Sequence, residues 1–396
     1  MLRMGIKKNY NHTLYASYIG YITQAIAVNF APLLFLTFKN VYHIPLDKIT
    51  LLITVNFIIQ LLVDLASAKF ADKIGYRPLA VAAHIFASVG IAGLGVFPRF
   101  FPDPYTGLFI AVIFYAVGGG LIEVLISPIV QACPSSKKSA AMSLLHSFYS
   151  WGQVFVILGS TVFFVAFGLA HWQILACLWA VIPFLNAVYF SQVPIATLTE
   201  AYGSIGLGKL LCVKLFWLFA LLMVCAGASE LSMSQWASAF AESGLRVNKT
   251  VGDLAGPCLF AVFMGISRVL YSQFSAKINL NLFMAGSGVL GVVCFLLAAL
   301  SPYPVLALAG CSICGFAVGI LWPGTLSLAA ADCPAGGTAM FALLALAGDL
   351  GCSAGPTAVG MVSDAAGGNL KSGLCVAIIF PVMLILALVL YRRQAN

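Results

Sequence analysis

Long apolar segments recur along the whole sequence, and they constrain the fold more than any other feature. We count twelve such runs, each long enough to cross the hydrocarbon core of a bilayer as an α-helix. Only 8% of the residues are charged, whereas soluble domains carry about 25%. The sequence therefore predicts an all-α membrane protein with twelve transmembrane helices.

The runs have recognisable ends. The first six cover about residues 13–38, 49–70, 78–97, 107–132, 140–166 and 172–190, the seventh begins near Leu211, the eighth covers 253–274, the eleventh covers 338–361 and the twelfth ends at Tyr391. Gly75 suits a tight helix end, and Pro78 suits the first turn of the third helix.

The net charge of +8 follows membrane topology and does not indicate a nucleic-acid partner. Arg3, Lys7 and Lys8 precede the first run without a small-residue cleavage site, so this run is predicted to be a retained helix and not a signal peptide. With that end inside, fourteen of the 20 Lys and Arg lie on cytoplasmic segments, as the positive-inside rule expects. The prediction is a multi-pass plasma-membrane protein with both termini in the cytoplasm.

A weak internal repeat predicts two halves. Residues 70–74 (Phe-Ala-Asp-Lys-Ile) resemble residues 274–278 (Phe-Ser-Ala-Lys-Ile), and Cys-Pro pairs occur at 133–134 and 333–334. Residues 192–209 are the longest poorly hydrophobic stretch between runs. We therefore predict a six-helix bundle over residues 1–191, a cytoplasmic linker over 192–209 and a second bundle over 210–396, in parallel register as transporter halves often are.

Glu123 stands inside the apolar run from Gly107 to Ala132. A charge at bilayer depth costs at least about 2.5 kcal/mol, and such residues are functional by default. Asp349 is close to the middle of the eleventh run. For Asp349, a hydrogen bond that packs Gly348 and Gly351 against another helix is the alternative.

Residues 68–78, Ala-Lys-Phe-Ala-Asp-Lys-Ile-Gly-Tyr-Arg-Pro, resemble the loop signature G-x-x-x-D-[RK]-x-G-x-[RK]-[RK] of the major facilitator superfamily. Asp72, Lys73, Gly75 and Arg77 match it, whereas Ala68 and Pro78 depart from it. The resemblance implies that the aspartate tethers the loop to a neighbouring helix and biases a conformational switch. Asp72 and Arg77 are accordingly predicted to be gating residues.

Within this superfamily the chain most resembles the fucose–proton symporter branch. Glu123-x-x-x-Ser-Pro128, residues 146–152 (His-Ser-Phe-Tyr-Ser-Trp-Gly), Trp322-Pro323 and residues 360–365 carry the resemblance. Two positions depart from it. Asn29 stands in the region where the branch has an aspartate, and His146 stands where it has a glutamine.

Glu123, His146 and Asp349 are the predicted proton-coupling residues. At 1.5 Å per residue, Glu123 lies about 13 Å and His146 about 9 Å from the inner ends of two consecutive helices, so they can approach each other. Such a pair can take and release a proton as water access alternates. A structural ion pair or hydrogen bond is the alternative.

Substrate binding is predicted to use polar amides and aromatic rings, which can contact hydroxyls and the apolar face of a sugar. The candidates are Gln24, Asn29, Asn56, Gln60, Glu123, His146, Tyr149, Glu230, Trp236 and Trp322. For any one aromatic residue, packing or lipid contact is the alternative. For Glu230, a carboxylate that reaches the membrane interface is the alternative. Asp64 and Arg268 occupy equivalent positions of the repeat, and we predict a gating or structural pairing role for both.

The leading hypothesis is an alternating-access transporter in which two bundles rock about a central site. Its substrate is predicted to be a small neutral polar molecule, a monosaccharide, moved with protons or, alternatively, with sodium. A proton-driven exporter of an apolar compound is the second reading. An enzyme or sensor is disfavoured because the sequence has no P-loop, nucleophile elbow or metal constellation. No cofactor, metal or nucleic acid is expected, the only other partner is membrane lipid, and the chain is predicted to be a monomer.

Overall fold

The computed structural model describes residues 9–44, 46–196, 206–237, 240–241, 245–246, 254–367 and 369–395. All regular structure within these ranges is helical, and they contain no strand. In this part of the chain, ten helical segments are long and apolar enough to cross a membrane, and they correspond to the third to twelfth predicted runs. The first run is divided between α2 (Tyr10–Leu33) and the start of α3 (Phe35–Tyr42), the second lies within α4 (Leu46–Ile74), and none of these three helices is among the ten. The count of twelve therefore stays a prediction.

The chain packs into two compact units. Unit 1 comprises Met1–Pro134, Trp151–Ser204 and Gly337–Ala342, and unit 2 comprises Ser135–Ser150, Ile205–Gly336 and Leu343–Asn396. Two helices, α7 (Lys138–Phe167) and α18 (Gly337–Ala365), contribute residues to both units. The predicted linker at 192–209 lies partly outside the described residues, so the predicted division of the chain stays a prediction.

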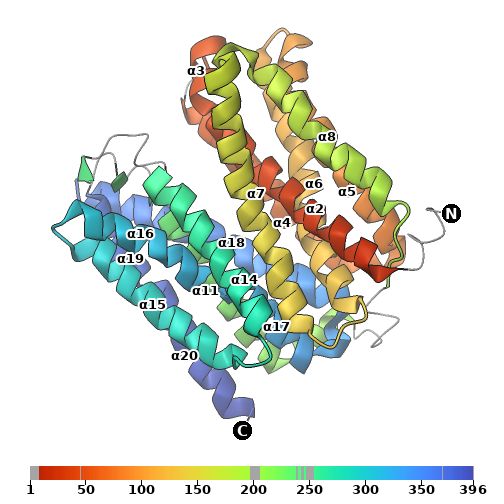
Figure 1. Ribbon diagram of the computed structural model, residues 1–396, viewed down its shortest axis with the longest axis vertical. Helices are drawn as coiled ribbons and strands as arrows, with labels where there is room; N and C mark the ends of the chain where they lie inside the picture. The colour runs from red at the N-terminus through yellow and green to blue at the C-terminus, as the bar shows by residue number, and fades with distance from the viewer. Residues whose placement is uncertain are drawn as a thin grey trace. The chain divides into compact units, whose positions relative to one another are not determined.

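Unit 1 is built around α6, which packs against several other helices. Besides α2 and α4, the unit holds α3 (Phe35–Tyr42), α5 (Tyr76–Val96), α6 (Pro104–Ala132) and α8 (Trp172–Phe190). Helices α2, α4 and α5 pack against α6, and α8 packs against α5 and α2 (Figure 1). Phe38 and Trp172 are buried in its core with ring centroids 5.5 Å apart. The unit is therefore held together mainly by apolar packing between helix flanks.

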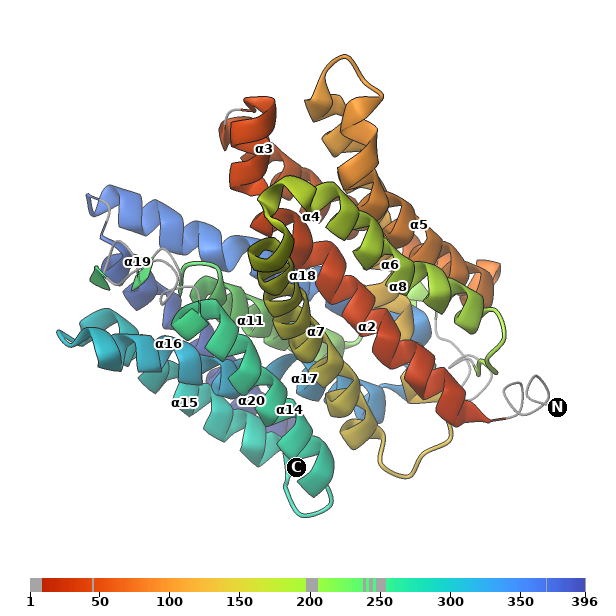
Figure 2. The same ribbon diagram turned by 45° about the horizontal axis from the view of Figure 1, so that its top comes forward.

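Unit 2 contains the later helices. They are α10 (Leu207–Leu211), α11 (Lys214–Ser234), α14 (Leu259–Phe274), α15 (Leu280–Leu300), α16 (Pro304–Val318), α17 (Leu321–Asp332), α19 (Leu370–Ala377) and α20 (Ile379–Ala395). Helix α16 packs against both α14 and α15, and α20 packs against α11 and α15 (Figure 2). Helices α16 and α17 follow each other with only Gly319 and Ile320 between them, so the predicted tenth run is helical in two parts.

The turn between α4 and α5 has the conformation that its sequence predicts. Gly75 has φ +95°, a value that glycine adopts at little cost. Its amide donates to the carbonyl of Ala71 at 2.9 Å and closes the end of α4. Pro78 follows in the first turn of α5. The predicted helix end at Gly75 is confirmed.

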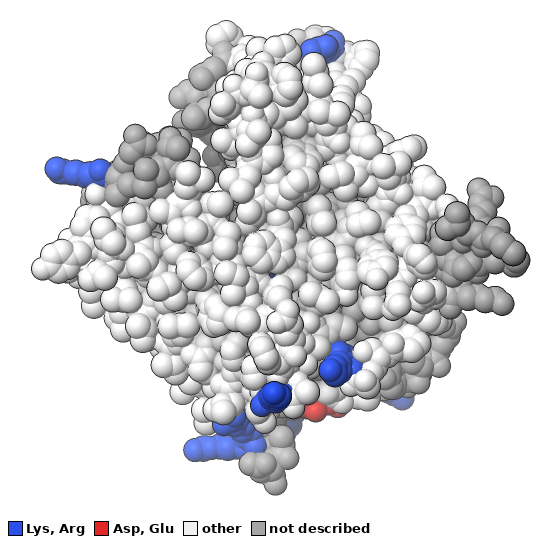
Figure 3. Space-filling view, in the orientation of Figure 1, with Lys and Arg blue, Asp and Glu red and all other residues white. Residues whose placement is uncertain are grey.

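Large apolar side chains are exposed along the helix flanks. Val165 is 83% exposed and Leu185 is 60% exposed. In the view of Figure 3, uncharged residues cover most of the surface and the few Lys and Arg lie toward its edges. Extensive exposed apolar surface is rare on soluble monomers. The flanks therefore fit a lipid environment.

Candidate functional site

Glu123 lies on α6 three residues after a glycine run, Gly118–Gly120, that brings other helices close. A Cβ atom at Gly118 would come within 2.5 Å of the Ala87 amide nitrogen on α5, and one at Gly120 within 3.2 Å of Val63 on α4. A side chain at either glycine position would therefore force α6 away from α5 or α4. The glycines make room for the neighbouring helices one turn before the carboxylate.

Three predicted polar residues of unit 1 gather at this part of α6. Gln24 on α2 donates its Nε2 hydrogen to Oε2 of Glu123 at 2.6 Å. Gln60 on α4 is 3% exposed, and its Nε2 would lie 3.3 Å from a Cβ at Gly119, one helical turn before Glu123. One turn further along α6, the hydroxyls of Tyr21 and Ser127 are 2.8 Å apart. We call Gln24, Gln60 and Glu123 the α6 polar cluster.

Buried amide oxygens of unit 1 have no hydrogen-bond partner within the described ranges. They are Oδ1 of Asn186 on α8 and, near the α6 polar cluster, Oε1 of Gln24 and Oδ1 of Asn56, and these side chains are 2%, 5% and 6% exposed. Burying an unbonded polar atom costs about 1–3 kcal/mol, so such atoms need an explanation. The oxygens of Gln24 and Asn56 can accept a hydrogen bond from a hydroxyl of a bound molecule.

Asn29 and Asp64 are placed differently. The Asn29 amide donates to the carbonyl of Ala25 at 2.9 Å, within its own helix α2. Asp64 is fully buried on α4. The structure thus brings Gln24, Gln60 and Glu123 together but turns the Asn29 amide group back to its own helix.

In unit 2, Arg268 on α14 is the centre of a buried hydrogen-bond network. Its side chain is 2% exposed, and Nη2 lies 3.4 Å from Oε2 of Glu230 on α11. Nη1 donates to Oγ of Ser150 at 2.7 Å and to the carbonyl of His146 at 3.0 Å, both on α7. Nε donates to the carbonyl of Gly319 at 2.7 Å. The guanidinium therefore joins three other elements to α14, and Glu230 is its ion-pair partner.

The carbonyl of Gly319 is available to Arg268 because of Pro323. In an α-helix this carbonyl would accept from the amide of the residue four positions later. That residue is Pro323, which has no amide hydrogen. The next amide, that of Gly324, donates to Ile320 at 2.7 Å, so helical bonding resumes at once. The Trp-Pro pair singled out in the sequence thus creates a main-chain acceptor for a buried cation.

Asp349 and the two predicted tryptophans lie along α18. A Cβ at Gly348 would come within 2.2 Å of the Trp322 ring, and one at Gly351 within 2.1 Å of the Val224 carbonyl oxygen on α11. Asp349, which is 5% exposed, is between these two glycines. Trp236 donates its indole hydrogen to the carbonyl of Pro356 at 3.0 Å. Trp322 and Trp236 therefore both pack against α18, and the remaining candidate, Tyr149, is half-buried on α7.

Two of the predicted gating residues, Asp72 and Arg77, contact defined partners in unit 1. Asp72 accepts a hydrogen bond from Oγ1 of Thr338 at 2.7 Å, and the hydroxyl of Tyr76 also contacts Thr338. Arg77 donates to the carbonyls of Phe190 and Ser191 at the end of α8, at 3.3 Å and 2.9 Å. The α4–α5 turn is thus bonded to the first turns of α18 and to the end of α8.

Several of these groups were not predicted from the sequence. Ser150, Thr338 and the Gly319 carbonyl are partners of charged side chains, yet none was among the candidates. A serine or threonine in an apolar run is too common to stand out. The Gly319 carbonyl could have been found, because a proline inside a helix always leaves the carbonyl four residues earlier without its helical donor.

Comparison with known proteins identifies the family. The sequence matches the Major Facilitator Superfamily over residues 17–356, and the chain belongs to this family of membrane transporters. The family indicates a transporter and not an enzyme. No curated protein sequence matches the chain.

Solved structures share the fold. The Escherichia coli fucose:proton symporter FucP aligns with a TM-score of 0.76 and 15% identity, over 96% of this chain and 97% of that one. The proton:xylose symporter XylE aligns with a TM-score of 0.82 and 12% identity, over 97% and 95%. The human organic anion transporter MFSD10 aligns with a TM-score of 0.71 and 15% identity, over 96% and 100%. At these identities the likeness shows the fold alone.

Proposed function

We propose that this protein is a secondary active transporter that moves a small polar solute, a monosaccharide, together with protons by alternating access. The observation that carries the proposal is the hydrogen bond of 2.6 Å between Gln24 on α2 and Glu123, which is the only charged residue of α6. A carboxylate at this depth is kept for a pathway or a proton relay. The fucose and xylose symporters among the similar structures support the same reading.

The substrate class follows from the available acceptors. Oε1 of Gln24 and Oδ1 of Asn56 are buried amide oxygens with no bonding partner in the described part of the chain. Hydroxyl donors of a sugar match them, and neutral amides add no charge that would favour an ionic solute. Gln60, Tyr149, Trp236 and Trp322 complete the proposed contacts, with Asn29 and Glu230 as further candidates.

Proton coupling is assigned to Glu123, His146 and Asp349. Each is an ionisable residue within a helix that is apolar enough to cross a membrane. Asp64, Asp72, Arg77 and Arg268 are assigned to gating. In this proposal the chain crosses the plasma membrane twelve times, with the bundles at residues 1–191 and 210–396, both termini in the cytoplasm and a monomer as the working unit.

Uptake into proteoliposomes tests the proposal. A panel of radiolabelled monosaccharides is first screened by thermal shift, because a ligand that binds only the folded form raises its stability. The best ligand is then supplied under an inward proton gradient. We expect accumulation that an uncoupler abolishes, and at least a tenfold loss of accumulation in Glu123→Gln.

Asp103→Asn is the matched control, because Asp103 caps the start of α6 by accepting from the Tyr105 amide at 3.1 Å, outside the apolar run. Asparagine can cap a helix equally well, so this variant should transport normally. Normal accumulation by Glu123→Gln would refute the proton role of Glu123.

A proton-driven exporter of an apolar compound is the second candidate, and Asn29 favours it. The resembled branch has a carboxylate in this region, whereas Asn29 is neutral and its amide donates to the Ala25 carbonyl. Flux measured in inverted membrane vesicles separates the two functions. Proton-driven accumulation of an apolar dye in inverted vesicles, without sugar uptake in right-side-out vesicles, would favour the exporter.

A further inference from the structure

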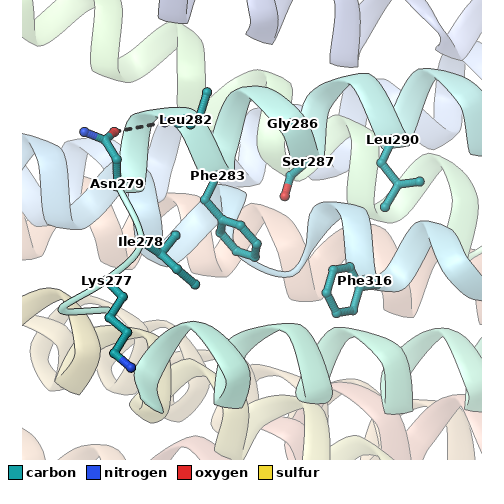
Figure 4. Close-up of a pocket in the computed structure, with 9 residues that line it drawn as sticks. All are labelled: Lys277, Ile278, Asn279, Leu282, Phe283, Gly286, Ser287, Leu290 and Phe316. Atoms are coloured by element: carbon teal, nitrogen blue, oxygen red, sulfur yellow. Dashed lines mark hydrogen bonds between the residues drawn. The ribbon is translucent and has the colours of Figure 1, made fainter. Parts of the chain in front are cut away.

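Unit 2 has a groove on the flank of α15 that the transport proposal does not use. Its cavity volume is about 490 Å³. Its lining comprises Lys277, Ile278, Asn279, Leu282, Phe283, Gly286, Ser287, Leu290 and Phe316 (Figure 4). We call it the α15 groove. Apolar side chains dominate its walls, and its single charged residue, Lys277, lies at one end, in the loop that precedes α15.

The charged end can bind an anion. Lys277 is exposed, and its ammonium group forms no salt bridge with another residue in the described ranges. It lies three residues before the first residue of α15, whose amide groups give that helix end a partial positive charge. Asn279 already caps the helix by accepting from the Leu282 amide at 3.1 Å. A cation and a helix N-terminus together favour a phosphate group.

An unpartnered hydroxyl on a mostly buried serine provides a second, independent sign of a ligand. Ser287 is only 4% exposed, yet its Oγ forms no hydrogen bond with any described residue. Figure 4 shows this oxygen directed to the side of α15 on which Phe283 and Phe316 lie. A serine in this position usually bonds its own helix or a neighbour. An ester oxygen of a bound molecule can accept this hydrogen bond.

The apolar part of the groove has the length of one bilayer leaflet. Asn279 and Leu290 both line it, and the helix between them rises about 16 Å at 1.5 Å per residue. Half of a hydrocarbon core about 30 Å thick is about 15 Å. Leu282 is 63% exposed beside it, so the groove is reached from the flank of the helix.

We propose that the α15 groove binds one anionic phospholipid, with its phosphate at Lys277 and the α15 N-terminus, a glycerol ester near Ser287 and an acyl chain along Gly286, Leu290 and Phe316. Charge complementarity selects the occupant: a zwitterionic lipid offers the same chain but no net charge for Lys277. This proposal is independent of the substrate and of proton coupling.

Photo-crosslinking to the full-length protein in neutral detergent micelles tests it. The probe is phosphatidylglycerol with a diazirine in the middle of one acyl chain, and labelled peptides are located by mass spectrometry. We expect labels within residues 280–300 and about fivefold weaker labelling by the matching phosphatidylcholine probe, since one Lys at a membrane surface contributes about that factor.

Four variants sharpen the test. Lys277→Gln should reduce phosphatidylglycerol labelling about fivefold and leave phosphatidylcholine labelling unchanged. Lys214→Gln removes another exposed lysine, at the start of α11, and should change neither. A Cβ atom at position 286 would meet open space, so Gly286→Leu should fill the groove and abolish labelling by both lipids, whereas Gly286→Ala should retain it.

Other results would overturn the proposal. Equal labelling by both lipids, or labelling in Gly286→Leu as strong as in the wild type, would exclude a built lipid site here. Equal loss in Gly286→Ala and Gly286→Leu would show that steric filling is not the cause. Competition by millimolar glycerol 1-phosphate alone would identify a site for a free phosphate and not for a lipid. Thermal unfolding of each variant confirms that it is folded.

Discussion

Nη2 of Arg268 lies 3.4 Å from Oε2 of Glu230, and the two side chains are 2% and 14% exposed. Both charged groups are therefore largely removed from solvent. Desolvation of two charges can cancel their attraction, so such a pair does not by itself stabilise a fold. Its significance is that either partner alone would be a buried, uncompensated charge.

The first prediction concerns this pair. Arg268→Met should lower the free energy of unfolding by about 3–5 kcal/mol, because it leaves Glu230 buried without its cation. Arg268→Met combined with Glu230→Leu should recover most of that loss. Denaturant unfolding in mixed micelles measures both. Arg393→Met, at the exposed end of α20, is the control and should stay within about 0.5 kcal/mol of the wild type. Additive losses in the double variant would show that the two groups do not interact.

The second prediction concerns Pro323. In Pro323→Ala the new amide can donate a hydrogen bond to the Gly319 carbonyl. This amide then competes with Nε of Arg268 for the same acceptor. Arg268→Met should therefore cost about 1.5–3 kcal/mol less in the Pro323→Ala background than in the wild type. A double-mutant cycle measures this coupling. Pro128→Ala, which restores an amide inside α6, serves as the comparison and should leave the cost of Arg268→Met unchanged.

The third prediction concerns Gln24. Gln24→Leu removes the donor that is 2.6 Å from Glu123, and hydrogen bonds to charged groups contribute about 1.5–3 kcal/mol. We expect that loss of stability and at least a tenfold loss of proton-driven uptake. Asn29→Leu removes an amide that bonds only to its own helix among the hydrogen bonds described, so its stability loss should be smaller. Equal losses in the two variants would contradict a special role for the Gln24 contact.

The fourth prediction concerns Thr338. This side chain is 1% exposed and its hydroxyl contacts both Asp72 and Tyr76. Thr338→Val keeps the shape but removes the hydroxyl, so it should cost about 1–3 kcal/mol and slow transport. Thr338→Ser should restore both properties. Thr357→Val removes an exposed hydroxyl that bonds within its own helix, and unfolding measurements should find it within about 0.5 kcal/mol of the wild type.

The sequence predicts the helices well because long apolar runs have few alternatives in a membrane. The predicted run 172–190 coincides with α8, and the predicted run 107–132 differs from α6 only at its start. A helix satisfies its own backbone groups, so its extent depends mainly on local composition. The family also follows from local motifs, since the match over residues 17–356 confirms the resemblance seen in residues 68–78.

The partners of the polar residues are harder to predict. Arg268 and Ser150 are far apart in sequence, and their contact depends on how α7 and α14 pack. Periodicity places a residue on a helix face, but it does not say which helix that face meets. The same holds for Glu230, which the sequence predicts to bind substrate or to reach the membrane interface, and whose carboxylate lies 3.4 Å from Arg268. The predicted approach of Glu123 and His146 stays a prediction.

The Gly319 carbonyl has one more implication. It belongs to the main chain, so no change of side chain at position 319 can abolish it as an acceptor for Arg268. What specifies the contact is a missing hydrogen four positions later, at Pro323. Homologues that retain this contact should therefore be recognised by a proline at position 323 and an arginine at position 268. An acidic or amide side chain facing the cation is not required.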